Sequence, residues 1–143
     1  MSMPNILVVE SDANVRELAA TFLRGAGHAV AFADQGAEAL ASIEQARPDV
    51  VITEILLKKL DGLSLCRRIK SNPTEPMIRV IIMSILAATV RSQEAGADLF
   101  LKKPLMQHRL VDAVSSVLAA PQEVFHEPPA DPRPDQSTPH LVR

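Results

Sequence analysis

A regular alternation of two apolar patterns constrains the fold of this chain more than any other feature. Five short runs are nearly continuously apolar, as in the buried strands of a parallel sheet, and they occupy residues 6–9, 28–33, 49–53, 79–83 and 98–101. Apolar residues at helical spacing follow each run, from residue 14 to the glycines at 25 and 27 and then over 37–46, 64–70, 89–95 and 107–119. The pattern predicts an α/β fold with a doubly wound, five-stranded parallel sheet.

The composition of the chain changes after residue 120. Residues 121–143 contain six of the eleven prolines, set among Asp, Glu, Gln, Ser and Thr. Such a segment cannot bury enough apolar surface to offset its ordering entropy. We therefore expect one folded domain over residues 1–120 and a disordered, proline-rich tail over 121–143. The tail is too short to fold as an output domain, so we expect a stand-alone protein.

Charge, cysteine content and the N-terminal segment disfavour several classes of protein. A formal net charge of -2 gives no electrostatic reason to expect a nucleic-acid partner. The single cysteine, Cys66, excludes an internal disulfide framework, and its helical context indicates a packed side chain. No stretch near the N-terminus is long and apolar enough for a signal peptide or a membrane span. We expect a cytoplasmic protein without a membrane partner.

Polar side chains follow four of the predicted strands. They are Glu10, Ser11 and Asp12 after the first strand, Glu54 after the third, Ser84 after the fourth, and Lys102 and Lys103, followed by Pro104, after the fifth. In a doubly wound sheet, functional groups gather outside the carboxyl ends of the strands. Carboxylates, a hydroxyl and an ammonium group in one crevice suit a divalent cation and a phosphoryl group.

Four segments together resemble the receiver domain of two-component response regulators, and the resemblance covers about residues 4 to 119. They read ILVVESDANVRELAATFLRGAGH, PDVVITEILLKKLDG, VIIMS and GADLFLKKP. The resemblance implies a flavodoxin-like fold with strand order 2-1-3-4-5. It also implies a site where acidic residues bind Mg²⁺ and an Asp accepts a phosphoryl group from a histidine kinase.

Several residues match the family pattern. Glu10 takes the first acidic position, Ser84 the hydroxyl that contacts the phosphoryl group, and Phe100 the aromatic that commonly reports the switch. Lys103, followed by Pro104, takes the position of the lysine. The resemblance implies these roles.

Other positions depart from the pattern. Ser11 stands where a second acidic metal ligand is expected, and Glu54 stands where the phosphoaccepting Asp is expected. Lys58 and Lys59 replace residues that are commonly proline and glycine in the family. The stretch from residue 84 to 95 is about one helical turn shorter than usual.

These departures predict a weakened site. Only Glu10 and Glu54 remain as metal-binding carboxylates, so we expect weak or absent Mg²⁺ binding and no other cofactor. The extra methylene of Glu54 shifts its carboxylate by roughly 1.5 Å. Because a misplacement of about 1 Å can cost on the order of a hundredfold in rate, phosphoryl transfer to Glu54 should be impaired.

Two hypotheses describe what Glu54 does instead. Its carboxylate could approach Lys103 and Ser84 and mimic the active state permanently, through hydrogen bonds that a phosphoryl group would otherwise make. Alternatively, Glu54 and Lys103 form an inert pair in a domain kept for its surfaces.

Five further residues carry a structural interpretation beside a functional one. Asp12 could turn into the metal site, but it also stands where a helix N-cap belongs. Ser11 is a spacer or a hydrogen-bond donor, since no base is paired with it to make it a nucleophile. Phe100 is a strand residue as well as a candidate switch. The pair Lys58 and Lys59 is a solvated loop or a basic feature for an acidic partner.

The sequence favours an atypical receiver that acts by protein–protein contact and is not an enzyme. By analogy with the family, the fourth helix, fifth strand and fifth helix would contact a histidine kinase, a downstream effector or a second copy in a homodimer. One alternative is a competent phosphoacceptor that uses Glu54 or Asp12. Another is a small-ligand sensor, although no glycine-rich phosphate loop follows the first strand. A metal-dependent phosphatase is a remote alternative, because it needs an aspartate nucleophile directly after the first strand.

Overall fold

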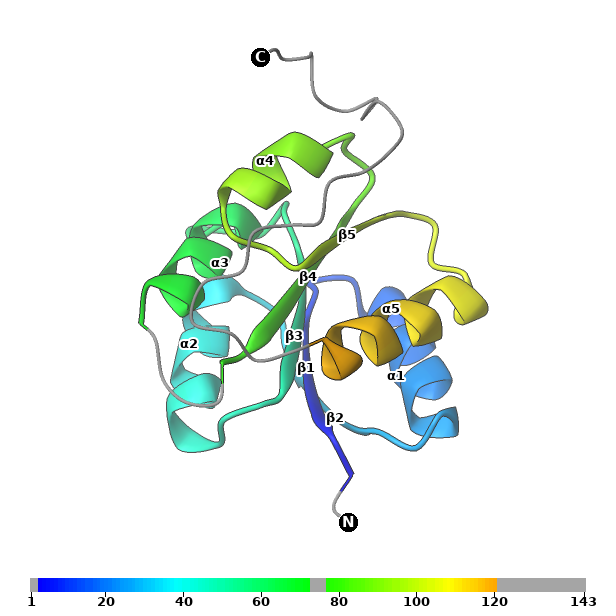
Figure 1. Cartoon of the computed structure of the whole chain (residues 1–143). Coiled ribbons are helices and arrows are strands. Elements are labelled where there is room, and N and C mark those ends of the chain that lie inside the picture. Colours follow the sequence, from blue (N-terminus) through cyan, green and yellow to red (C-terminus); the bar gives the residue numbers. More distant parts are fainter. Residues whose placement is uncertain (1–2, 73–76, 121–143) are drawn as a thin grey trace.

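The computed structural model describes residues 3–72 and 77–120, and within them five strands alternate with five helices (Figure 1). The strands are β1 (Asn5–Val9), β2 (Ala29–Ala33), β3 (Val50–Glu54), β4 (Arg79–Ser84) and β5 (Leu99–Lys102). The helices are α1 (Ala13–Gly25), α2 (Gly36–Gln45), α3 (Gly62–Ser71), α4 (Thr89–Glu94) and α5 (Gln107–Ala119). The interpretation of residues 121–143 as a tail lies outside the described residues.

All five strands form one parallel sheet in the order β2-β1-β3-β4-β5, which confirms the predicted fold class and strand order. The register sets the ends of neighbouring strands side by side. Val9 pairs with Thr53, and Ser84 pairs with Lys102. Residues directly after β1 and β5 therefore lie at the same edge of the sheet as the last residues of β3 and β4.

Helices cover both faces of the sheet, with α1 and α5 on one face and α2, α3 and α4 on the other (Figure 1). Successive side chains of a strand point to opposite faces. In β1, Ile6 and Val8 therefore pack with the core under α1 and α5, while Leu7 and Val9 pack with the core under α2 and α3. This burial on both faces explains why the strands are continuously apolar in sequence.

Most predicted boundaries lie within one residue of the structure, and α5 is as predicted. The largest correction is α3, which begins at Gly62, not at residue 64. An Asp-Gly pair such as Asp61 and Gly62 is typical of a turn, but here the carboxylate of Asp61 accepts a hydrogen bond from the backbone N–H of Ser64 at 2.9 Å and so caps the helix. Strands β3 and β4 each extend one residue further than predicted and end with Glu54 and Ser84.

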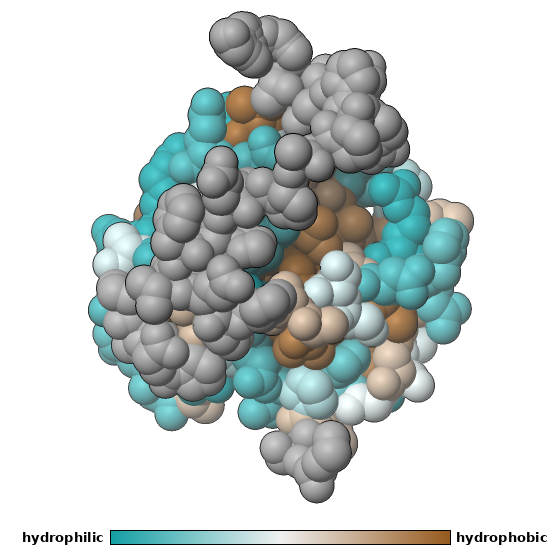
Figure 2. Space-filling view, viewed as in Figure 1, coloured by the Kyte–Doolittle hydropathy of each residue, from teal (hydrophilic) through white to brown (hydrophobic). Residues whose placement is uncertain are grey.

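Helix α4 is short, as predicted, with only six residues. Within the described residues, no helix is long and apolar enough to cross a membrane. Figure 2 shows hydrophobic surface gathered near the centre of the viewed face, around β5, with mainly hydrophilic surface on the flanks. Leu99 and Phe100 of β5 are half-buried.

Candidate functional site

The carboxyl edge of the sheet brings together four of the predicted site residues. Glu10 directly follows β1, Glu54 ends β3, Ser84 ends β4, and Lys103 directly follows β5. Glu10, Glu54 and Ser84 are buried, and Lys103 is half-buried. Their convergence follows from the parallel order of the strands, since β3 lies beside both β1 and β4.

The ammonium group of Lys103 lies between the two glutamate carboxylates. Its Nζ atom is 2.7 Å from Oε1 of Glu10 and 2.6 Å from Oε1 of Glu54. Both distances are those of short charge-assisted hydrogen bonds. The backbone N–H of Lys103 also donates to the carbonyl oxygen of Ser84 at 2.9 Å, which fixes the lysine against the end of β4.

The second oxygen of the Glu54 carboxylate is held by the backbone. Its Oε2 atom accepts hydrogen bonds from the N–H groups of Ile55 at 2.7 Å and Leu56 at 3.0 Å. The hydroxyl of Ser84 lies near this carboxylate and favours its charged form. The ammonium of Lys103 and the two amides at this edge of the sheet therefore all bind the side chain of Glu54.

Burial and hydrogen bonding act in opposite directions on the pKa of Glu54. Burial raises the pKa because it disfavours the charged carboxylate, but the hydrogen bonds from Lys103 and Ser84 lower it more. The net effect holds the pKa of Glu54 below its ordinary value of 4.5. Burial likewise lowers the pKa of Lys103, and its bonds to the two carboxylates outweigh this and raise it above 10.5. Glu54 and Lys103 are both charged at neutral pH.

Glu10 is fixed by its own loop. Its Oε2 atom accepts a hydrogen bond from the backbone N–H of Asp12 at 3.1 Å, and its carbonyl oxygen accepts one from the guanidinium of Arg16 at 2.6 Å. Arg16 lies one turn into α1, so this contact ties the helix to the loop after β1.

Ser11 and Asp12 do not join this cluster. Both are exposed, and the carboxylate of Asp12 accepts hydrogen bonds from the backbone N–H groups of Asn14 at 2.8 Å and Val15 at 3.4 Å. Asp12 is thus the N-cap of α1, which confirms the structural interpretation of this residue.

The remaining candidates surround the cluster without contacting its charged atoms. Lys58 and Lys59 are exposed in the β3–α3 loop, and Lys59 has a φ of 69°. Phe100 packs against the core under α2, α3 and α4. Pro104 is exposed and is joined to Lys103 by a cis peptide bond.

The side chains at this edge do not fit a tightly bound Mg²⁺ ion. Two carboxylates face each other, and the ammonium of Lys103 already lies between them, where a shared cation would be held. Within residues 3–72 and 77–120, no group of three or more His, Cys, Asp and Glu side chains could hold a metal ion. Mg²⁺ normally binds carboxylate oxygens that are free to accept it.

Two contributions to the site could not be found from side-chain patterns. The amides of Ile55 and Leu56 act through the backbone, so the identity of these residues carries no signal. The guanidinium of Arg16 binds the backbone carbonyl oxygen of Glu10, six residues earlier in the sequence. That separation indicates a contact only once the start of α1 is known.

A parallel sheet in the order β2-β1-β3-β4-β5 with five helices is the flavodoxin-like fold of the receiver domains used in two-component signalling. The chain belongs to that family, since the model for the response regulator receiver domain matches residues 6–115. Receiver domains of response regulators interact with histidine kinases and effectors, and they are signalling proteins, not classical enzymes.

Known relatives agree with this assignment. The probable transcriptional regulator ycf27 of Guillardia theta is 34% identical over 113 residues, which are 79% of this chain and 44% of the relative. The DNA-binding response regulator MtrA of Mycobacterium tuberculosis is 31% identical over 113 residues, 79% of this chain and 50% of MtrA. The chain thus spans about half the length of these relatives.

A solved structure shows the same fold. The crystal structure of a putative response regulator from Chloroflexus aurantiacus superposes with a TM-score of 0.79 at 34% identity. The match covers 83% of this chain and 100% of that one.

Proposed function

We propose that this chain is an atypical receiver domain that signals through protein–protein contacts, with phosphorylation lost or strongly impaired. Glu54 stands at the phosphoacceptor position in this proposal. The supporting observation is that its carboxylate already uses hydrogen-bond donors that a phosphoryl group would need, namely Lys103 and two backbone amides, with Ser84 nearby. An incoming phosphoryl group would have to break these bonds and displace a buried charge.

The same contacts support permanent mimicry over an inert pair. An inert pair requires only Glu54 and Lys103, whereas here the carboxylate also binds two backbone amides and lies near Ser84, the residue at the family's hydroxyl position. Glu54 therefore supplies an internal anion at the site. In this proposal the domain stays in one signalling state whether or not a kinase is active.

Exposed apolar side chains support a role in protein contact. A groove of about 450 Å³ opens beside Lys103, lined mainly by apolar side chains that include Leu18, Ile85 and Leu105. Ile85 is 62% exposed and Leu18 is 43% exposed, and both line this groove, so the groove presents exposed apolar surface beside the charged site. We propose a kinase or effector protein as the partner, bound through this rim or through the α4–β5–α5 face.

We do not propose that this chain binds DNA. MtrA is described as DNA-binding, but this chain matches only about half of it. The formal net charge of -2 over the whole chain gives no electrostatic reason to expect a nucleic-acid partner. The expectation of a stand-alone protein remains a prediction, and the mass of the native polypeptide tests it.

Intact-mass measurement after incubation with Mg²⁺ and a small phosphodonor tests the proposal directly. We expect that the mass of the unmodified protein does not change. The double variant Ser11→Asp with Glu54→Asp, which restores the family pattern, should gain the mass of one phosphoryl group. The single variant Glu54→Gln is the matched control, because it removes the charge without restoring an acceptor. A phosphoryl gain by the unmodified protein would show a competent phosphoacceptor and contradict the proposal.

A further inference from the structure

A second groove lies at the opposite edge of the sheet, between α2 and α3. It has a volume of about 310 Å³ and an apolar floor that includes Leu40, Ile43 and Ile78. Among the described residues, two arginines, Arg47 and Arg68, and one acidic residue, Glu44, also line it. Nothing in the signalling site described above uses this groove.

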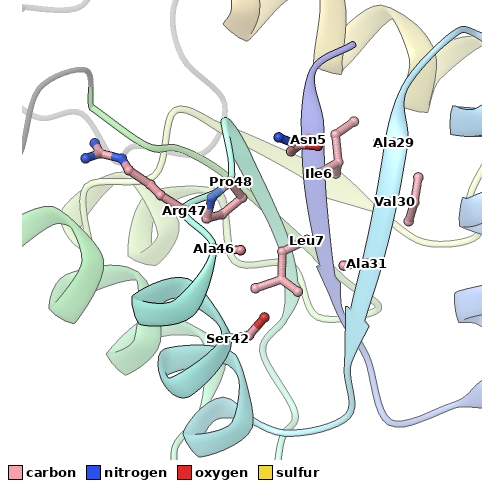
Figure 3. A pocket seen from close by; sticks show the side chains of 10 residues that line it. All are labelled: Asn5, Ile6, Leu7, Ala29, Val30, Ala31, Ser42, Ala46, Arg47 and Pro48. Carbon is pink, nitrogen blue, oxygen red and sulfur yellow. The ribbon is translucent and has the colours of Figure 1, made fainter. Parts of the chain in front are cut away.

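Arg47 connects this groove with a smaller pocket of about 210 Å³ under the end of α2 (Figure 3). In that view Leu7, Ala31 and Ala46 surround the pocket, while the guanidinium of Arg47 points away from them (Figure 3). The amino edge of the sheet therefore offers apolar surface with positive charge beside it.

The described part of the chain ends close to this groove. The carbonyl oxygen of Ala120 accepts a hydrogen bond from the guanidinium of Arg79 at 2.7 Å, so the end of α5 is held at the first residue of β4. Ile78, the preceding residue, is buried with the core on the α2 and α3 side. A chain that leaves Ala120 needs only to pass around the amino end of β4 to reach the groove.

The sequence that follows Ala120 has the matching chemistry. Residues 121–131 carry three carboxylates, on Glu123, Glu127 and Asp131, and no lysine or arginine. Phe125 lies between the first two of them and is the only aromatic residue after Phe100. An aromatic side chain between carboxylates complements an apolar floor beside arginines.

We propose that residues 123–127, with the sequence EVFHE, bind in cis in the α2–α3 groove. Phe125 occupies the apolar floor, and the carboxylates of Glu123 and Glu127 face the arginines. The groove is large enough, since a cavity of roughly 150 Å³ accommodates a benzene ring. Ala120 is held on Arg79 at the start of β4, so the segment begins at the sheet itself. Five residues span up to about 16 Å, more than the roughly 10 Å from a sheet to the layer packed on it, so Phe125 can reach the floor.

Attachment to the same chain favours occupancy. A short linker gives an effective concentration in the millimolar range, so even a weak contact is populated. A partner that uses the α2–α3 face must then displace this segment, while the Glu54 and Lys103 edge stays accessible.

A spin label next to Phe125 tests the proposal in the full chain. The variant His126→Cys provides the attachment point, and Cys66 should not compete, because it is fully buried and burial raises the pKa of its thiol to about 12. We expect the methyl NMR signals of Ile43 and Ile69, which line the α2–α3 groove, to lose most of their intensity. The signal of Val111, which lines a groove between α1 and α5 on the other face of the sheet, should keep its intensity.

Two substitutions and one mixing experiment make the test specific. Adding Phe125→Ser should restore the Ile43 and Ile69 signals, whereas Leu141→Ser, which removes an apolar residue further along, should not. Unchanged signals in the labelled protein, or a loss that persists after Phe125→Ser, would overturn the proposal. The mixing experiment combines spin-labelled molecules with unlabelled molecules whose methyl signals are observed. Signal loss in the unlabelled molecules alone would show that the groove binds the segment of a second copy, which would also overturn the proposal.

Discussion

Replacing Lys103 with methionine should destabilise the fold severely at neutral pH. The side chains of Glu10 and Glu54 are 3% and 5% exposed, and that of Lys103 is 15% exposed. Both Oε1 atoms lie within 2.7 Å of the same nitrogen, so the variant leaves two buried carboxylates facing each other without a cation. Removing one partner of a buried ion pair costs about 3–5 kcal/mol, against about 0–1 kcal/mol for a surface pair. We expect a loss of about 3 kcal/mol in the free energy of unfolding.

Lowering the pH should reduce the difference in the free energy of unfolding between the Lys103→Met variant and the unmodified protein. In the unmodified protein the pKa of Glu54 is below 4.5, so its stabilising contribution is complete above about pH 4.5 and is lost as pH falls through the folded-state pKa. In the variant, burial and the facing carboxylate raise the pKa of Glu54 above its unfolded value. As pH falls, Glu54 of the variant therefore takes up a proton at a higher pH than Glu54 of the unmodified protein. This protonation removes the cost of burying an unpaired charge, so the variant regains stability while the unmodified protein has not yet lost any.

Urea unfolding at about pH 7 and about pH 5 measures both effects. Lys102→Met is the matched control, because it removes the same charge from an exposed neighbour and should change the unfolding free energy by less than about 0.5 kcal/mol. A loss below about 1 kcal/mol for Lys103→Met, or an equal loss at both pH values, would refute the view of the cluster as a buried, charge-dependent site.

Three other substitutions test the loops that hold the site, each by its urea unfolding midpoint. Lys59→Gly should stabilise by about 1 kcal/mol, because a φ of 69° costs a lysine more than a glycine, while Lys58→Gly should not stabilise. Gly62→Ala should destabilise by about 1–3 kcal/mol, because the added Cβ would overlap the backbone carbonyl of the last β3 residue. Gly25→Ala, with open space around it, should stay within about 0.5 kcal/mol. Asp12→Ala should cost about 1 kcal/mol through loss of the α1 cap, and no loss would contradict that role.

The fold could be predicted closely because its signals are local. Parallel strands buried on both faces must be apolar throughout, so the short apolar runs located every strand, and the helical period located every helix. The start of α3 was less predictable. Asp61 followed by Gly62 fits a turn as well as a helix cap, and only the position of Ser64 distinguishes the two.

The chemistry of the site was only partly predictable. The placement of Glu54, Ser84 and Lys103 at one edge follows from strand order, and the structure brings them together. The sequence did not reveal that Lys103 binds Glu10 as well as Glu54, because that depends on the distance between β1 and the β5–α5 loop. It also did not exclude a metal role for Asp12, which the structure places as a helix cap.

The ion pair between Glu10 and Lys103 has a consequence for the order of folding. The two residues are 93 positions apart, and closing a loop of that length costs about 4 kcal/mol of chain entropy. During synthesis the two glutamates leave the ribosome well before the lysine that neutralises them. Water cannot be excluded from these two carboxylates until β5 and the lysine after it have joined the sheet. The cluster is therefore among the last contacts to form, and a nascent chain that ends before β5 lacks it.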